Sequence, residues 1–463
     1  MRALSLVVLL LVAGCAAPAG PAPAPAAPAR AQEAGWPLHP LGLVGGEPSV
    51  GVTSSGAIFV AGHVILSADQ AIEERSLAGQ LARSTDGGVT WTLVGDVARD
   101  PKQNNDPWMW VDTATDRVFN APLNVACTSL AWSDDDGANW DANPAVACAP
   151  PSHDHQKLVT GLPPAGFTTS GYPSVAYYAY NSLLVTGTTG ILGAPVPLDE
   201  RLGTFVSTSL DGGLTFSVGK NIHESDCHRG IVGPPAVAPD GTVYIPHGTC
   251  DGVDVMVSRD AGATWDTASL DAVGSLDDFA FDPGVTVDEA GTAYLVWPGA
   301  DALLYLATSR DAGATWSAPA RITPPGVNAT VYSSIVATSA GRVAIAYAAT
   351  TDPTEGWGGL ASSEADDDTT WHLWVTLLDG AATRHVRLTS DEDPLQRGCI
   401  WMRGGSSDCR NLFDFVTIVA HGDALYLSYT DGCNACASAD ESTRSDLMLA
   451  VSPPHPWDAP RSS

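Results

Sequence analysis

Positively charged side chains are scarce in this chain of 463 residues. Lysine and arginine together number 22, against 52 aspartates and glutamates, so the formal net charge is −30. A chain with this imbalance is repelled by phosphate backbones and by anionic lipid headgroups. We therefore exclude nucleic acid and anionic membrane surfaces as partners. An acidic ligand would need a local basic pocket.

Long apolar runs are absent after the N-terminus. Residues 1–14 combine one arginine with an apolar run too short to span a bilayer permanently, which is typical of a signal peptide. The run ends in Val12-Ala13-Gly14-Cys15, which resembles the bacterial lipobox, whose cysteine is lipidated. Residues 15–35 form an Ala/Pro-rich linker that cannot pack. We expect an extracytoplasmic protein anchored to the cell envelope by lipid on Cys15, and to the membrane only in this way, with plain secretion as the alternative.

The sequence also lacks the patterns of helical proteins and of metalloproteins. No stretch longer than a turn or two repeats its apolar residues with helical spacing. The 11 histidines form no H-x-x-x-H pattern, and no acidic stretch has the EF-hand spacing. We therefore expect no cofactor and no metal site. The acidic runs at 134–136, 277–278 and 366–368 leave one structural calcium ion as the alternative.

An eight-residue phrase, S-x-D-x-G-x-T-W, is what the chain has in abundance. Five copies begin at Ser84, Ser133, Ser209, Ser258 and Ser309, with Asn for Thr in one and Phe for Trp in another. Most copies are about fifty residues apart, which indicates a repeat architecture. In each copy the aspartate can accept hydrogen bonds from the turn, and the glycine can adopt a positive φ. We predict a structural role for the five aspartates, Asp86, Asp135, Asp211, Asp260 and Asp311.

Two stretches of alternating apolar residues precede each of these turns, separated by a polar turn, as in antiparallel strands. Two further copies without a clear S-x-D turn begin at Tyr332 and Phe413, which makes seven units. The seventh unit has three strands, and residues 40–46 are placed to supply its fourth. We predict an all-β fold: a single β-propeller of four-stranded blades over residues 36–455, closed by an N-terminal strand. Seven blades are expected, with six as the alternative, and residues 456–463 form a C-terminal tail.

The cysteines fit an exported protein. Of the nine, Cys15 belongs to the lipobox, so eight remain, an even number. They cluster along the chain, and we expect neighbours to form disulfides. The four pairs of neighbours are Cys127 with Cys148, Cys227 with Cys250, Cys399 with Cys409, and Cys433 with Cys436. The C-x-x-C spacing of the last pair could alternatively serve redox chemistry or metal binding, but no second such motif accompanies it.

The five turns resemble the Asp-box, or BNR, repeat of the sialidase-like propeller superfamily. This superfamily includes glycosidases, sortilin-type receptors and non-catalytic assembly factors. The lipobox together with DPWMWVD, DHQKL and CRNLFDFV is more narrowly similar to bacterial lipoproteins described as sialidase-like. The resemblance implies a site in the central funnel where three arginines grip a carboxylate beside a tyrosine nucleophile, its glutamate and an acid/base aspartate. The R-I-P tripeptide of the family is absent from the first unit, and the nearest string is Arg321-Ile322-Thr323-Pro324 in unit five.

Polar residues in the loops that lead into the innermost strands are the candidates for this funnel. Tyr332 is the candidate nucleophile, and Glu47 and Asp106 are candidate acids or bases; a pair of carboxylates would also suit ordinary glycoside hydrolysis. The candidates for substrate binding are Arg229, Arg403, Arg410 and His155. The same loops carry Asp154, Asp282 and Asp414.

Two functional classes remain open. In the first, the chain is a secreted, membrane-anchored, sialidase-like Asp-box propeller that acts on or binds glycans in its funnel. If it is an enzyme, it is an exo-glycosidase. In the alternative it is a non-catalytic scaffold or receptor that binds a protein partner. We expect a monomer, and the propeller alone does not decide between the two classes, because this fold hosts many functions.

Overall fold

The computed structural model describes 14 segments of the chain. They are residues 35–63, 80–94, 105–123, 127–151, 153–182, 203–224, 231–249, 252–271, 282–353, 369–400, 409–412, 414–433, 436–437 and 444–458. The predicted signal peptide, Cys15 and nearly all of the predicted linker lie outside these segments and stay predictions. Within them, no helix is long and apolar enough to cross a membrane.

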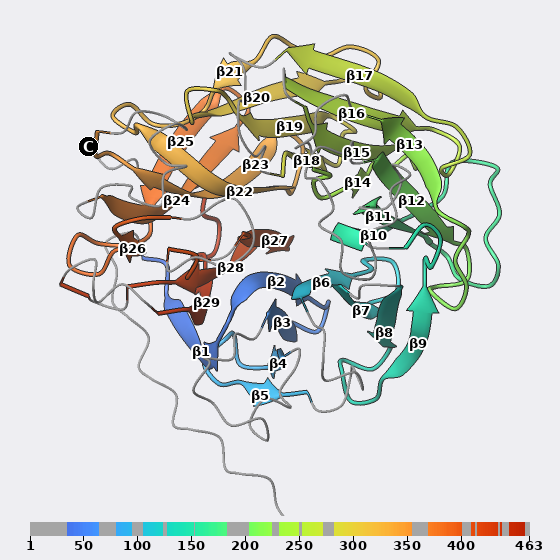
Figure 1. The fold of residues 1–463 in the computed structure, drawn as a ribbon, viewed down its shortest axis with the longest axis horizontal. Helices are drawn as coiled ribbons and strands as arrows, with labels where there is room; N and C mark the ends of the chain where they lie inside the picture. Colours follow the sequence, from blue (N-terminus) through green and yellow to red (C-terminus); the bar gives the residue numbers. More distant parts are fainter. Residues whose placement is uncertain are drawn as a thin grey trace, which may run out of the picture.

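Seven antiparallel sheets form a ring around a central axis (Figure 1). In six sheets the strands follow one another outward in chain order. Blade one consists of β2 (Gly46–Val52), β3 (Ile58–His63), β4 (Gln80–Ser84) and β5 (Thr92–Leu93). Blade two consists of β6 (Asn105–Val111), β7 (Val118–Leu123), β8 (Thr128–Ser133) and β9 (Asp141–Val146). Blade three consists of β10 (His153–Gly161), β11 (Val175–Ser182), β12 (Gly203–Ser209) and β13 (Lys220–Glu224).

Blades four to six continue in the same way, and a short strand, β26 (Gln396–Arg397), adds to β24 of blade six. Blade four consists of β14 (Ala236–Val237), β15 (Val243–Gly248), β16 (Gly252–Ser258) and β17 (Asp266–Asp271). Blade five consists of β18 (Gly284–Val287), β19 (Ala293–Pro298), β20 (Leu304–Ser309) and β21 (Ala320–Arg321). Blade six consists of β22 (Ala329–Ala337), β23 (Arg342–Thr350), β24 (Thr370–Asp379) and β25 (Ala382–Arg387).

Blade seven joins the two ends of the ring. It consists of β27 (Thr417–His421), β28 (Ala424–Asp431), β29 (Asp446–Val451) and, as its outermost strand, β1 (Leu38–Val44). β1 runs antiparallel to β29, with Pro40 opposite Met448 and Val44 opposite Asp446. The prediction of an all-β propeller with seven four-stranded blades and an N-terminal closing strand is therefore confirmed, and the alternative of six blades is wrong.

Each S-x-D-x-G-x-T-W phrase closes the turn after the third strand of a blade. In blade one, Asp86 accepts hydrogen bonds from the Ser84 hydroxyl at 2.8 Å, the Thr90 N–H at 2.9 Å and the Thr90 hydroxyl at 2.6 Å. The other four aspartates make the corresponding contacts within their own turns, with the side-chain amide of Asn139 in place of the threonine hydroxyl at Asp135. All five are therefore satisfied by their own turns. Because neighbouring strands are antiparallel, these turns lie at the end of the ring opposite to the loops that lead into the innermost strands.

The fifth residue of each phrase is a glycine for two reasons. Its φ is positive in all five copies, between 78° and 97°. In addition, each glycine packs against the preceding blade, where a Cβ would come within about 3 Å of a side chain. Gly213 lies on Leu130 of blade two, and Gly313 lies on Val257 of blade four. The repeated turns thus fix the distance between neighbouring blades as well as closing their own strands.

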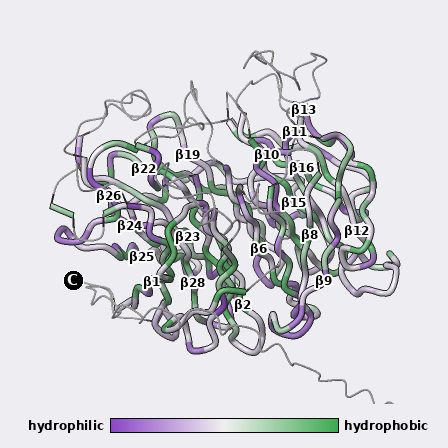
Figure 2. Tube along the Cα trace, turned by 60° about the horizontal axis from the view of Figure 1, so that its bottom comes forward, coloured by the Kyte–Doolittle hydropathy of each residue, from purple (hydrophilic) through white to green (hydrophobic). Residues whose placement is uncertain are grey.

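Hydrophobic residues follow the strands, and many of the most hydrophilic segments lie in the connecting turns (Figure 2). The packing between blades is apolar and aromatic, and Trp297, Trp371 and Tyr178 are fully buried. Beyond β29 the chain continues over blade six, where the carbonyl of Pro456 accepts a hydrogen bond from Arg384 at 2.7 Å. The first residues of the predicted tail are thus packed against the ring.

Three disulfides join neighbouring cysteines, as predicted. They are Cys127–Cys148, Cys399–Cys409 and Cys433–Cys436. Cys227 and Cys250 lie outside the described residues. Disulfides persist in oxidising surroundings, so these three indicate an extracytoplasmic protein.

Candidate functional site

Four innermost strands share an irregularity near their first residues. β2, β6, β10 and β22 each shift register there, as in a β-bulge. At each bulge a residue other than glycine has a positive φ: 52° at Glu47, 44° at Asp106, 49° at His155 and 56° at Tyr332. Positive φ is unfavourable for such residues and is concentrated at functional sites. The four bulges aim polar side chains at one end of the central channel.

Glu47 and Asp106 form a carboxyl pair across blades one and two. The Asp106 N–H donates to Glu47 Oε2 at 3.0 Å, and the two side chains are hydrogen-bonded to each other. Burial and the charge of Asp106 raise the pKa of Glu47 well above its usual range. Burial alone would raise the pKa of Asp106, but the hydrogen bond from Glu47 and the charges of His155 and Lys157 lower it. Glu47 is therefore the protonated member and Asp106 the ionised one, an acid beside a carboxylate.

Arg410 connects this pair to blade seven. Its Nη2 lies 3.4 Å from Glu47 Oε1, and the same nitrogen donates to the carboxylate of Asp414. Tyr332 is 5% exposed and lies in the same electrostatic neighbourhood. Burial, with the charges of Asp414 and Glu47, raises the pKa of Tyr332 well above its usual value despite Arg410. In this arrangement Tyr332 is a neutral phenol, and Arg410 is already paired with the carboxylate of Asp414.

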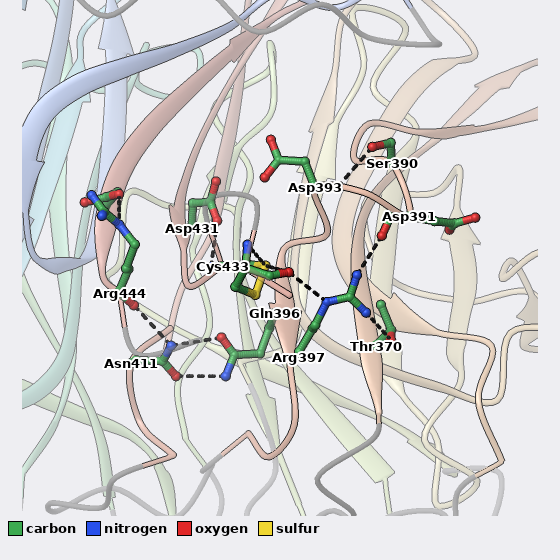
Figure 3. Close-up of a disulfide and its surroundings, with 12 residues drawn as sticks. Thr370, Ser390, Asp391, Asp393, Gln396, Arg397, Asn411, Asp431, Cys433 and Arg444 are labelled. Atoms are coloured by element: carbon green, nitrogen blue, oxygen red, sulfur yellow. Dashed lines mark hydrogen bonds and ion pairs between the residues drawn. A yellow bond between two sulfur atoms is a disulfide. The ribbon is translucent and has the colours of Figure 1, made fainter. Parts of the chain in front are cut away.

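Hydrogen bonds and a disulfide hold the segment that carries Arg410, and Figure 3 shows the contacts of Gln396, Arg397 and Asn411 among them. The amides of Gln396 and Asn411 exchange two hydrogen bonds, at 2.8 and 3.1 Å, and both side chains are buried. The Cys399–Cys409 disulfide ends directly before Arg410. Further along, Arg397 Nε donates to the carbonyl of Cys436, which is disulfide-bonded to Cys433, at 3.1 Å. A loop held by these hydrogen bonds and disulfides can keep the guanidinium group of Arg410 in a fixed position at the channel.

A second ionic group lies on blades three and five. His155 Nδ1 is 3.1 Å from Asp282 Oδ1, and Lys157 Nζ is 3.3 Å from Asp282 Oδ2. These contacts are ion pairs by distance, although neither has good hydrogen-bond geometry. Lys157 is only 1% exposed, and its ammonium group also lies over the rings of Phe415, at 4.1 Å, and Trp108, at 5.1 Å. Cation–π contacts of a desolvated ammonium offset part of the cost of burying it.

The two groups close one end of the channel. A cavity of about 780 Å³ is lined by residues of all seven innermost strands. A much smaller cavity, about 20 Å³, lies between Lys157, Asp282, Tyr332 and Asp414. Ligand pockets usually measure ~300–1,000 Å³, so no sugar ring fits among the buried groups. A ligand would instead contact the outer side of the cluster, where the side chains of Arg410 and Asp414 are 20% and 21% exposed.

The ionic group on His155 predicts a pH dependence of stability. Burial alone would lower the pKa of His155, but the carboxylates of Asp282 and Asp154 outweigh it and raise the pKa to about 9. The folded state therefore binds this proton more tightly than the unfolded state, in which the pKa is about 6.5. The stabilisation is fully present below about pH 6.5 and is lost as the pH rises through about 9, a change on the order of 3 kcal/mol.

Urea unfolding of the wild type and of His155→Gln near pH 6 and near pH 9.5 measures this change. The free-energy difference between the two proteins should shrink by ~3 kcal/mol at the higher pH. His153→Gln is the matched control, because burial lowers the pKa of His153 and its effect should not change above about pH 6.5. An equal effect of His155→Gln at both pH values would contradict the assignment.

The structure brings five of the seven predicted catalytic and binding residues together: Glu47, Asp106, His155, Tyr332 and Arg410. Arg229 and Arg403 lie outside the described residues, so the proposed three-arginine grip rests on Arg410 alone in the described part. Sequence reasoning did not single out Lys157 or Phe415. The DHQKL string contains Lys157 two residues after His155, but a lysine within a strand is normally exposed.

No group of three or more His, Cys, Asp or Glu side chains that could hold a metal ion is found among the described residues. Within the acidic run at 134–136, Asp134 pairs with Arg117 at 2.6 Å, Asp135 fastens its own turn, and Asp136 accepts a hydrogen bond from Thr53 at 2.8 Å. Asp277, Asp278 and residues 366–368 lie outside the described part of the chain. The described acidic run therefore has protein partners rather than the free oxygens of a calcium site.

A ring of seven four-stranded blades with five Asp-box turns defines a sialidase-like BNR propeller. The chain belongs to the BNR repeat-like domain family, whose model matches residues 198–458, more than half of the chain. A comparison with curated proteins finds no significant match.

Solved structures with a similar arrangement are distant in sequence. A protein of unknown function from Dyadobacter fermentans is 14% identical, over 91% of this chain and 96% of that chain, with a TM-score of 0.43. The NanB sialidase from Streptococcus pneumoniae is 12% identical, over 92% and 70%, with a TM-score of 0.43. The Aleuria aurantia lectin is 10% identical, over 74% and 94%, with a TM-score of 0.44. None of these distant likenesses bears on the site of this chain.

Proposed function

We propose that the protein binds uncharged glycans at the channel end formed by Glu47, Asp106, His155, Tyr332 and Arg410. The observation that carries this proposal is the set of four positive-φ bulges, which collect an acid, a carboxylate, an imidazolium and a phenol from four different blades. Strained positions persist where the surrounding structure enforces them, and in proteins they cluster at binding and catalytic sites. Carboxylates, a guanidinium group and the nearby Phe415 ring suit hydroxyl groups and the apolar face of a sugar.

The preference for an uncharged sugar follows from the charges around Arg410. A sialidase-type grip needs arginines that are free to form two bonds with a ligand carboxylate. Arg410 instead faces Glu47 and Asp414, and the whole chain is strongly acidic. An acidic sugar would have to displace these partners against a repulsive field. A neutral sugar can accept from Arg410 and donate to Asp414 without breaking the pair.

The Glu47–Asp106 pair also supports acid–base chemistry on a bound glycan. Glycosidases use one protonated carboxyl group as the acid and an ionised one as base or nucleophile. Here Glu47 holds the proton and Asp106 the charge. The two groups touch, whereas glycosidase carboxyl pairs are ~5–9.5 Å apart. Cleavage would therefore require a ligand to separate them, and binding is the function that the described arrangement supports first.

The test uses the chain from residue 35 onward on a glycan array and on fluorogenic glycosides, with sialosides included. We expect binding of neutral glycans, and Arg410→Gln should weaken it about tenfold or more, since a hydrogen bond to a charged group contributes ~1.5–3 kcal/mol. Arg259→Gln is the matched control, because Arg259 lies at an Asp box on the opposite face and pairs with Asp266. If cleavage occurs, Glu47→Gln should abolish it and retain binding. Absence of any glycan binding would reject the proposal. The alternative of a non-catalytic scaffold or receptor that binds a protein partner would then remain.

A further inference from the structure

Two buried histidines lie side by side between blades three and four. His223 is on β13 and His247 is at the end of β15, and their ring centroids are 4.5 Å apart with the planes tilted by 41°. The His223 side chain is 7% exposed, and His247 is completely buried. Neither ring belongs to the site described above.

One nitrogen of each ring is held by a side chain of the neighbouring blade. His223 Nε2 is 2.6 Å from Asp254 Oδ2 on β16, and His247 Nδ1 is 2.8 Å from Thr204 Oγ1 on β12. Asp254 and Thr204 are the cross-strand neighbours of the other histidine, so each blade supplies one ring and one partner. These contacts fix both ring orientations. The Asp254 carboxylate can only accept, so His223 Nε2 carries its proton and Nδ1 keeps a lone pair. The Thr204 hydroxyl can accept from His247 Nδ1 in the same way, and Nε2 then keeps a lone pair.

The other two nitrogens have no partner. His223 Nδ1 and His247 Nε2 are both buried and make no hydrogen bond. A buried polar atom without a partner costs ~1–3 kcal/mol, and two of them on adjacent rings need an explanation.

We propose that His223 Nδ1 and His247 Nε2 bind one divalent transition-metal ion of the Zn²⁺ class, which joins blades three and four. Imidazole nitrogens suit such ions at ~2.0–2.1 Å, and rings this close can share one ion. Metal-binding histidines almost always donate their second N–H to a carboxylate or another oxygen, and Asp254 and Thr204 place such oxygens beside these rings. The two ring nitrogens are two of the four ligands that such an ion usually takes, so we expect water to supply the others. The sequence showed no such site because the two residues are not part of a local motif.

The test measures metal content and thermal stability of the purified chain. The protein is stripped of metal with EDTA, incubated with ZnCl₂ and desalted. We then expect about one equivalent of zinc per chain by inductively coupled plasma mass spectrometry. Zinc at about a hundred times its dissociation constant should raise the Tm by several degrees. Calcium and magnesium should have no such effect, because they prefer oxygen ligands. Failure of the wild type to retain zinc and to gain stability would overturn the proposal.

Four variants separate this site from adventitious binding. His223→Gln and His247→Gln should each lose the bound zinc and the Tm increase. Asp254→Asn keeps both ligands and should weaken zinc affinity ~10–100-fold, as expected for an outer partner. His153→Gln is the matched control, since both nitrogens of His153 already have partners, Tyr178 and the carbonyl of Pro150. Zinc retention that is equal in all four variants would also overturn the proposal, and circular dichroism verifies that each variant is folded.

Discussion

A chain that begins at Gly46 should fail to yield a folded monomer, whereas a chain that begins at Gly35 should fold. The shorter chain lacks β1, the outermost strand of blade seven, and Trp36, which is fully buried in the core. Loss of the Trp36 side chain alone should cost about 3–5 kcal/mol. The edge of β29 would be left without its partner and free to pair with other chains. Size-exclusion chromatography and circular dichroism would show aggregated or unfolded protein.

Two controls separate loss of the strand from loss of length. A peptide of residues 35–45 added to the shorter chain should restore monomer, because it can pair with β29 in the same register. Trp36→Ala in the longer chain should lower the midpoint of urea unfolding without changing the oligomeric state. A stable, monomeric chain from Gly46 would show that β1 does not close the ring.

The fold was predictable because its signals are local and repeated. The alternation of apolar residues marks strands, the Asp-box turns count the blades, and the three-stranded last unit requires a closing strand. The position of the site was also predictable, since loops that lead into innermost strands must meet at one end of a ring. Glu47, Asp106 and Tyr332 come together there for this reason.

The pairing within the site could not be predicted. Positive φ at Glu47 or Tyr332 has no sequence signal, because neither residue type favours it. The protonation of Glu47 depends on its burial and on Asp106, which only the folded chain brings near. Lys157 was missed because its burial depends on Asp282, which is more than a hundred residues away, and on two aromatic rings. Burial and electrostatic contacts between residues far apart in the chain are not visible in a single sequence. They explain why the position of the site could be predicted but its pairing could not.

Replacing Lys157 by methionine should destabilise the protein by about 3–5 kcal/mol, because among the described residues it leaves the buried Asp282 carboxylate paired with His155 alone. Asp282→Asn alone should also be costly, since Lys157 is 1% exposed and would lose its counter-charge. Lys157→Met combined with Asp282→Asn should cost clearly less than the two single changes added together, by ~2–3 kcal/mol. Urea unfolding of the four proteins at one pH completes this double-mutant cycle.

The exposed pair of Arg259 and Asp266 is the matched comparison. Its atoms are 2.9 Å apart, a shorter distance than in the Lys157–Asp282 pair, but the two side chains are 39% and 82% exposed. The corresponding cycle with Arg259→Gln and Asp266→Asn should give less than about 1 kcal/mol of coupling. Equal coupling in the two cycles would mean that burial does not strengthen the central pair. Strong coupling only at Lys157 would show that burial strengthens the central pair, so that Asp282 serves the fold, whereas Arg410 and Asp414, at 20% and 21% exposure, remain within reach of a ligand.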